Sequence, residues 1–243
     1  MTIIKLNAID STNSYLRELC EAVPVDDMTI VVADSQNKGR GLMGTIWNSE
    51  KGKNLTYSVF KRHVDFFVDK NFFVSIVTSL ALIKTLNRFK ILDLSIKWPN
   101  DILADNKKIC GILIENVIKS NQLEFSIIGV GLNVNQHNFV NLPKASSMKK
   151  LTGTVYNLDQ VLRVFKKEIK VYFEILNRGE YELLKSEYEG HLFRQKKKSQ
   201  FKMPSGTVMT GVIEGINNQG KLIVRDHNKL RTLYDFKELE LIY

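Results

Sequence analysis

The sequence predicts an α+β protein with two domains, residues 1–191 and residues 192–243. In the first part, runs of β-branched and aromatic residues alternate with segments whose apolar side chains recur at helical spacing. Near residue 192 the composition changes, because a basic run leads into short β-rich stretches separated by glycines. Regularly spaced short strands of this kind predict a small β-barrel of about 50 residues.

The elements of the first domain follow from these patterns and from the turn residues between them. Strands are expected at residues 2–6, 29–33, 54–60, 94–98, 108–117 and 123–134, and residues 120–122 join the last two as a hairpin. One helix is expected to begin at Ser11 or Thr12, and others to span residues 72–86, 159–176 and 181–188.

Charge and cysteine usage narrow the class of protein. The chain carries 35 Lys and Arg against 26 Asp and Glu, and this net charge of +9 attracts anionic partners without choosing between nucleotides, nucleic acids and acidic proteins. Cys20 and Cys110 stand in apolar patterns without metal-ligand spacing, as in a reduced intracellular protein. We find neither an apolar run long enough to span a membrane nor a secretion leader, and we therefore expect a cytoplasmic protein.

A glycine-rich segment follows the strand expected at residues 29–33. Gly39, Gly41 and Gly44 fall within six residues, with Arg40 between the first two and Trp47 just beyond. Glycine permits tight bends and close approach of the backbone to a ligand, and Arg40 offers a planar fork to a carboxylate or phosphate. The segment predicts a mobile cationic loop, in which Trp47 either stacks on a heterocycle or packs in the core.

The same glycines match the dinucleotide motif G-x-G-x-x-G, but their context does not. That motif opens a helix and is followed by an acidic residue at the end of the next strand. Residues 48–53 have turn composition instead, and the next strand ends in basic residues. Thr45 stands where a Walker A loop needs lysine. A Rossmann site and a P-loop are therefore both disfavoured.

Polar residues gather at the first strand-to-helix turn. Ser11, Thr12 and Asn13 are consecutive there, whereas a helix cap requires only one side-chain oxygen. Backbone N–H groups also point outward at such a turn. The surplus of polar groups suits a small polar ligand.

Further polar residues stand at the ends of later strands. Asn100 and Asp101 form either a plain turn or a pair of oxygen ligands that hold Mg²⁺ together with substrate phosphates. Lys108 begins an apolar strand, where it either protects a sheet edge or balances phosphate charge. Asn133 follows close-approach glycines and can pair with a phosphate or ribose. Together these residues predict one polar site at the strand ends.

A covalent nucleophile is not expected. The four histidines stand in segments of surface-like composition, namely His63, His137, His191 and His227. Cys110 has no adjacent base. The chemistry of the site is therefore expected to rest on charge and hydrogen bonding.

In their order along the chain, these motifs resemble those of the biotin protein ligase family. The matching pieces are Ser11-Thr12-Asn13; Gln36 with Gly39-Arg40-Gly41 and residues 44–47; Lys97-Trp98-Pro99-Asn100-Asp101; residues 108–113 with Glu115; and residues 129–133. The resemblance implies a mixed β-sheet with helices and a C-terminal SH3-like β-barrel. It also implies a ligase that uses ATP, biotin and Mg²⁺ to form biotinyl-5′-AMP and then biotinylates a lysine of a biotin carboxyl carrier protein.

The resemblance implies a role for each matching residue. Arg40 and Lys108 are the implied catalytic residues. The implied biotin site comprises Ser11, Thr12, Asn13, Gln36, Arg40, Gly41, Leu42, Lys108 and Gly111. The implied ATP site comprises Gly39, Trp47, Asn100 and Asn133, with Asp101 as the magnesium ligand.

Two departures from the family pattern carry expectations of their own. Leu42 and Met43 stand where the family usually has further arginines, so we expect biotinyl-AMP to leak faster than from an arginine-rich relative. The chain begins almost at its first strand, so we expect no helix-turn-helix and no DNA-binding role. A monomer or a homodimer is expected.

Two rival hypotheses remain at this level. A lipoate ligase uses the same adenylation chemistry on a related fold. A non-enzymatic nucleic-acid-binding protein would instead use the C-terminal barrel and the basic run from Arg194 to Lys198, and would bind with a steep salt dependence.

Overall fold

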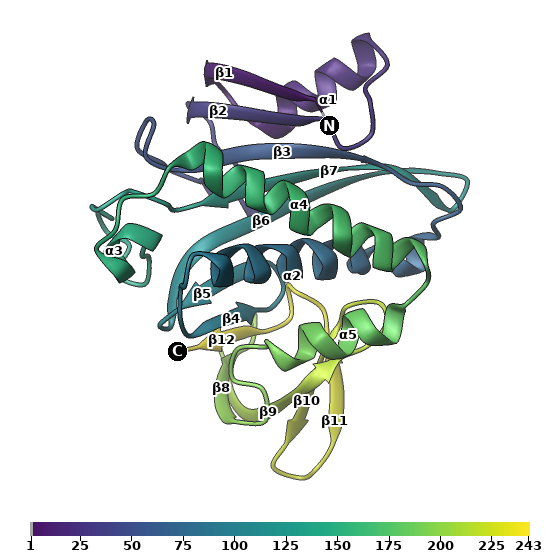
Figure 1. The fold of residues 1–243 in the computed structure, drawn as a ribbon. Coiled ribbons are helices and arrows are strands. Elements are labelled where there is room, and N and C mark those ends of the chain that lie inside the picture. Colours follow the sequence, from purple (N-terminus) through teal and green to yellow (C-terminus); the bar gives the residue numbers. More distant parts are fainter. Residues whose placement is uncertain (1) are drawn as a thin grey trace.

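Seven strands form the main sheet of the computed structural model, which describes residues 2–243 (Figure 1). They are β1 (Ile3–Ile9), β2 (Ile30–Gln36), β3 (Leu55–Arg62), β4 (Leu94–Lys97), β5 (Asp101–Ala104), β6 (Lys107–Lys119) and β7 (Gln122–Leu132). Their spatial order is β1-β2-β3-β7-β6-β5-β4. The β1–β2 pair is parallel and the other pairs are antiparallel, so the sheet is mixed.

Helices cover the sheet on both faces. The helices are α1 (Thr12–Ala22), α2 (Phe72–Arg88), α3 (Met148–Thr152), α4 (Leu158–Asn177) and α5 (Tyr181–Gly190). Figure 1 shows α2 and α4 lying across one face of the sheet. Ile30 and Ile128 belong to the large core that includes these helices, whereas the adjacent residues Val31 and Ile127 pack with Leu16 of α1. Because side chains alternate along a strand, α1 lies on the opposite face.

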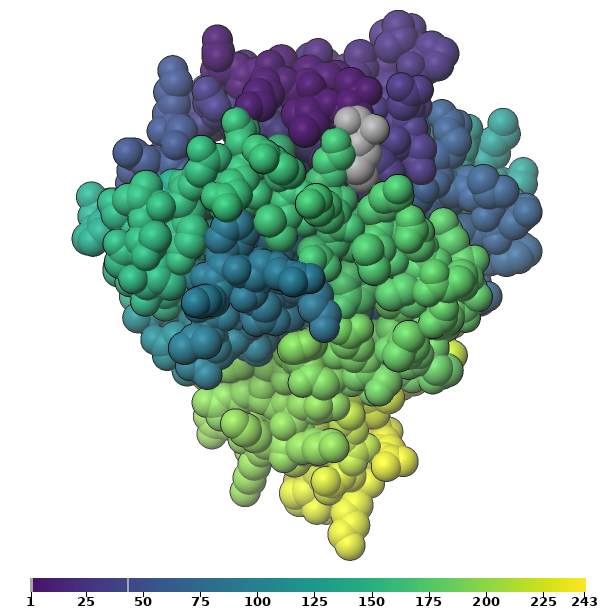
Figure 2. Space-filling view, viewed as in Figure 1, coloured from purple at the N-terminus to yellow at the C-terminus, as the bar shows by residue number. Residues whose placement is uncertain are grey.

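A second, five-stranded sheet follows α5 and is antiparallel throughout. Its strands are β8 (Lys198–Lys202), β9 (Val208–Ile216), β10 (Leu222–Asp226), β11 (Arg231–Tyr234) and β12 (Glu240–Ile242). Figure 2 shows it as a lobe at the bottom of the molecule. The predicted α+β class, with a mixed sheet and a β-rich C-terminal part, is confirmed. The SH3-like description and the boundary at residue 192 stay predictions.

Specific contacts attach the second sheet to the first part of the chain. Trp98 Nε1 donates a 2.8 Å hydrogen bond to the carbonyl oxygen of Gly220. The Glu189 carboxylate accepts a 2.8 Å hydrogen bond from the backbone N–H of Ile216. A Cβ atom at Gly220 would overlap the ring of Phe72, so the close approach requires glycine.

Among the strands and α-helices of the first part of the chain, two short elements, β5 and α3, have no counterpart among the expected ones. β5 has four residues, all buried, and begins at Asp101, for which the sequence allows a plain turn together with Asn100. α3 has five residues, too few for a helical period to be recognised. By contrast, the hairpin predicted at residues 120–122 is confirmed, since Ser120 and Asn121 adopt left-handed φ angles of 49° and 61°.

The surface placement expected for all four histidines is wrong for His63 and His191, which are half-buried. The His63 ring stacks on Phe66 at 5.1 Å between centroids, and its Nε2 lies 2.8 Å from Ser126 Oγ. Burial disfavours the charged ring and, with Lys61 nearby, lowers the pKa of His63 to about 4. Burial likewise lowers the pKa of His191.

The two cysteines, Cys20 and Cys110, are free thiols. Across residues 2–243, no helix combines the length and the apolar composition needed to cross a membrane.

Candidate active site

A cavity of about 590 Å³ lies on the face of the main sheet that carries α1. It collects residues from the start of α1, the end of β2, the glycine loop and strands β5, β6 and β7. The predicted site residues that line it are Ser11, Thr12, Asn13, Gln36, Arg40, Gly41, Leu42, Trp47, Asn100, Asp101, Lys108, Gly111 and Asn133. Gly39 is the predicted site residue that does not line it. The tertiary structure therefore brings together residues that are dispersed over more than half of the chain.

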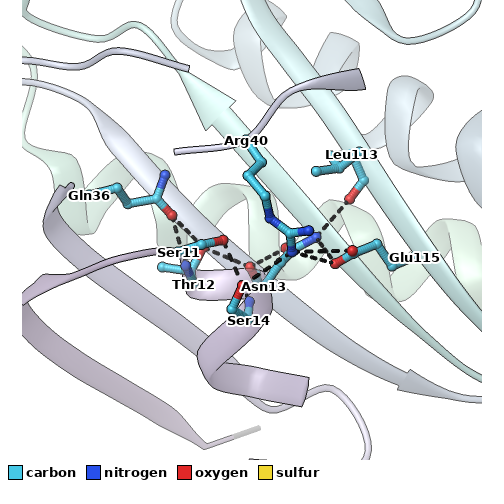
Figure 3. A network of polar contacts seen from close by, with 9 residues as sticks. Ser11, Thr12, Asn13, Ser14, Gln36, Arg40, Leu113 and Glu115 are labelled. Atoms are coloured by element: carbon cyan, nitrogen blue, oxygen red, sulfur yellow. Dashed lines mark hydrogen bonds and ion pairs between the residues drawn. The ribbon is translucent and has the colours of Figure 1, made fainter. Parts of the chain in front are cut away.

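One end of the cavity is built from hydrogen-bonded polar side chains (Figure 3). Ser11 caps α1 and accepts a hydrogen bond from the Ser14 N–H. Gln36 Oε1 accepts hydrogen bonds from the backbone N–H and the hydroxyl of Thr12, at 2.8 and 3.0 Å. Ser58 Oγ lies 2.5 Å from Asn13 Oδ1 and 2.7 Å from Thr12 Oγ1. Hydrogen bonds between these side chains hold them in place before any ligand binds.

Glycines make the floor of the cavity. A Cβ atom at Gly129 would overlap the Asn13 amide, and one at Gly131 would overlap the Trp47 indole. The third glycine, Gly111, brings β6 close to the same indole. The absence of side chains on β6 and β7 thus lets Asn13 and Trp47 lie directly on the sheet. Within the described part of the chain, Trp47 Nε1 is buried without a hydrogen-bond partner.

The other end of the cavity carries an excess of positive charge. Lys108 Nζ lies 2.7 Å from Asp101 Oδ1, and Lys97 Nζ lies 3.9 Å from Asp101 Oδ2. Asn100 Nδ2 donates to the Ile112 carbonyl oxygen at 2.9 Å, which holds its amide beside this group. Since two ammonium groups share one carboxylate, this end attracts anions.

Sequence reasoning missed two residues at this end, Lys144 and Tyr243. The Lys108 N–H donates to the Lys144 carbonyl oxygen at 2.7 Å, and the Ser146 N–H donates to the Lys108 carbonyl oxygen at 2.9 Å. Lys144 Nζ lies 4.3 Å from the centroid of the Tyr243 ring, and Lys97 Nζ lies 5.4 Å from it. Burial raises the pKa of the Tyr243 phenol. No periodic pattern or motif marks either residue, so only the folded chain reveals them.

The glycine loop closes one wall as a short hairpin. The Gly41 N–H donates to the Thr45 carbonyl oxygen at 2.7 Å, and the Trp47 N–H donates to the Gly39 carbonyl oxygen at 2.9 Å. A Cβ atom at Gly39 would overlap the Trp47 carbonyl oxygen, so Gly39 shapes the hairpin although it does not line the cavity. We call residues 39–47 the lid hairpin. The side chain of Met43 lies outside what the structure describes.

The cavity offers little to a metal ion by itself. Residues 2–243 contain no group of three or more His, Cys, Asp or Glu side chains that could hold one. Asp101 is the acidic residue of the cavity lining, and its carboxylate already pairs with Lys108. This donor set fits Mg²⁺ that arrives with a nucleotide, because such an ion takes one or two carboxylates and fills its other positions with phosphate oxygens and water.

Comparison with known proteins agrees with this geometry. Residues 6–133 match the family described as Biotin/lipoate A/B protein ligase family. Among curated relatives, the bifunctional ligase/repressor BirA of Bacillus spizizenii is 28% identical over 240 residues, which cover 96% of this chain and 72% of that protein. The biotin–[acetyl-CoA-carboxylase] ligase of Mycobacterium tuberculosis is 26% identical, with 87% of this chain and 79% of that protein covered.

Among solved structures, the biotin protein ligase of Aquifex aeolicus in complex with biotin and ATP has the same fold. It aligns with a TM-score of 0.81 over 99% of this chain and 98% of that chain, at 24% identity.

Proposed function

Because the chain belongs to the biotin/lipoate A/B protein ligase family, we propose that it is an ATP-dependent biotin protein ligase. It joins biotin to AMP with release of pyrophosphate and then transfers the biotinyl group to a lysine of a biotin carboxyl carrier domain. The observation that carries this proposal is a single cavity with a hydrogen-bonding end, a glycine floor and a cationic end. An acyl-adenylate has the same order of groups, with a polar ring system at one end and a phosphate further along.

The hydrogen-bonding end suits the ureido ring of biotin. Ser11, Thr12, Asn13 and Gln36 present fixed donors and acceptors there, and a buried ureido group requires such partners for both its N–H groups and its carbonyl oxygen. Gly111 provides room along the floor of the sheet. Gly41 and Leu42 line the same cavity from the lid hairpin.

Lys108 stands where the biotin carboxylate would meet the α-phosphate. Adenylation brings two anionic groups together, so a fixed ammonium group that faces both of them stabilises the transition state. Its backbone is held by hydrogen bonds to Lys144 and Ser146, and its side chain by the ion pair with Asp101. The site is therefore preorganised for this charge.

The remaining predicted residues suit ATP. Trp47 presents an aromatic ring beside the floor glycines for the adenine, while Asn100 and Asn133 provide amides for the nucleotide. Lys97 and Lys144 add positive charge where the β- and γ-phosphates would leave as pyrophosphate. Asp101 would be the protein ligand for Mg²⁺ that arrives with the phosphates, and this ion would offset phosphate charge when bound.

A lipoate ligase is the second function that the family description admits. The dithiolane ring of lipoate is apolar and has no groups that could hydrogen-bond with the polar side chains of Thr12, Asn13 and Gln36 at this end of the cavity. The hydrogen-bonding end of the cavity therefore favours biotin.

Pyrophosphate exchange into ATP, run with biotin and with lipoate in parallel, tests the activation step. We expect exchange with biotin and none above background with lipoate; the reverse result would assign the chain to lipoate activation. Labelled biotin added together with ATP and a biotin carboxyl carrier domain tests the transfer step. We expect label on the carrier lysine, and a carrier whose acceptor lysine is replaced by arginine should stay unlabelled.

A further inference from the structure

The guanidinium group of Arg40 points toward Glu115 on β6 and not toward the cationic end of the cavity. Arg40 Nη2 lies 3.2 Å from Glu115 Oε1, 3.3 Å from Glu115 Oε2 and 3.2 Å from Ser14 Oγ (Figure 3). The Glu115 side chain is 21% exposed and the Arg40 side chain 45%, so solvent screens the pair only in part. Lys108 and Lys97, in contrast, face Asp101.

Glu115 connects the lid hairpin to the hydrogen-bonding end of the cavity. Its Oε2 accepts a 2.8 Å hydrogen bond from Asn13 Nδ2, and Asn13 Nδ2 also lies 3.3 Å from the Leu113 carbonyl oxygen. One carboxylate on β6 therefore holds both the amide of the proposed biotin site and the arginine of the lid. Arg40 is the only Lys or Arg in residues 39–47, so no other cation of the hairpin can form this link.

We propose that Glu115 is a positioning residue that acts through Arg40, and that their ion pair latches the lid hairpin over the bound acyl-adenylate. This inference rests on the proposed function, because it assigns the retention of that intermediate to a particular contact. Closure of the lid keeps water from the mixed anhydride until the acceptor lysine arrives. Arg40 is the only charged residue in the lid hairpin, since Leu42 beside it is apolar. Its ion pair with Glu115 is therefore the charge–charge contact that holds the hairpin to the sheet.

Glu115→Gln removes the ion pair with Arg40 while keeping the hydrogen bond with Asn13. The glutamine amide oxygen can still accept the hydrogen bond from Asn13, while the negative charge that attracts Arg40 is lost. We expect preformed biotinyl-AMP to leave this variant roughly two to five times faster than the unaltered protein. Glu168→Gln is the matched control, because Glu168 is similarly buried, at 16% exposed, and pairs with Arg88 at 3.4 Å between α2 and α4, on the other face of the sheet.

A double-mutant cycle distinguishes the latch from a direct action of Arg40 on the phosphate. Arg40→Gln, Glu115→Gln and the double variant are loaded with biotinyl-AMP, and release is followed by stopped-flow fluorescence. If Arg40 acts through Glu115, the double variant releases no faster than the faster single variant. Rates that multiply would show two independent roles and would overturn the proposal.

Hydrogen exchange in the ligand-free protein tests the latch even if no biotinyl-AMP forms. The N–H groups of Gly41 and Trp47 are hydrogen-bonded within the hairpin, so their exchange reports its opening. We expect faster exchange in Glu115→Gln but not in Glu168→Gln, at equal thermal stability. Equal exchange in both variants would refute the latch. Failure of the unaltered protein to form the adenylate would refute the proposed function alone.

Discussion

Lys108 Nζ lies 2.7 Å from Oδ1 of Asp101, whose side chain is nearly buried at the cationic end of the cavity. Lys97 approaches the same carboxylate only to 3.9 Å, so Lys108 is its main partner. Each residue of this pair supports the other. Asp101 orients the ammonium group of Lys108, and that group offsets the negative charge of the Asp101 carboxylate, which is shielded from water.

Lys108→Ala should lower pyrophosphate exchange at least about 100-fold, because it removes a fixed positive charge from the reacting groups. It should also reduce the free energy of unfolding by about 1–3 kcal/mol, since Asp101 loses its closest partner. Urea unfolding measures the second effect. Adding Asp101→Asn should recover stability without recovering exchange. Wild-type exchange in Lys108→Ala would refute the assigned role.

Gly131→Ala should displace Trp47. The new methyl group would occupy the place of the indole, so the ring must tilt away from β7. We expect a change in tryptophan fluorescence and a KM for ATP raised by roughly tenfold, with stability lowered by about 1–3 kcal/mol. Gly190→Ala is the control, because no atom lies within 4 Å of the added carbon. Unchanged fluorescence and ATP affinity in Gly131→Ala would contradict the proposed position of the adenine.

Lys144→Gln should weaken the binding of ATP without weakening the binding of biotin. The substitution removes one of the cations beside Tyr243 and retains the backbone hydrogen bonds to Lys108 and Ser146. We expect the KM for ATP to rise roughly three- to tenfold while the KM for biotin stays constant. Lys149→Gln, on α3 and away from the cavity lining, is the comparison. Parallel increases of both KM values would point to a general structural effect instead.

Stability should fall between pH 6.5 and pH 4 in part because of His63. Burial lowers the pKa of this ring to about 4, so over that interval the unfolded chain binds a proton that the folded chain excludes. The full pKa difference between the unfolded and the folded chain corresponds to roughly 3 kcal/mol of the free energy of unfolding, which is lost progressively as the pH falls. In urea unfolding at pH 7 and pH 4.5, His63→Gln should lose less stability than the unaltered protein. An identical loss would show that His63 does not titrate in this way.

Many of the predicted site residues stand in short local strings, which can be recognised in a sequence. Ser11-Thr12-Asn13 stands at a strand-to-helix turn. Asn100 lies between β4 and β5, and Asp101 is the first residue of β5. Polar side chains at the ends of elements are often functional rather than part of the core. Trp98 belongs to the same string as Asn100 and Asp101, yet its indole N–H is bound to Gly220 of the second sheet. A motif thus identified the region without stating what each member contacts.

The α+β class, the longer strands and helices, and thirteen of the residues that line the cavity could be predicted from the sequence alone. These follow from apolar periodicity, turn residues and local motifs, which are properties of neighbouring positions. The folded chain was needed to show that Arg40 turns to Glu115, that Lys144 and Tyr243 join the cationic end, and that glycines of β6 and β7 underlie Trp47. Asn13 and Glu115, for example, are 102 positions apart and meet only because the sheet places β6 and β7 beside α1. Such contacts depend on the order of the strands in the sheet and on glycines that let other side chains approach the backbone. Neither can be predicted from the residues that neighbour each other in the sequence.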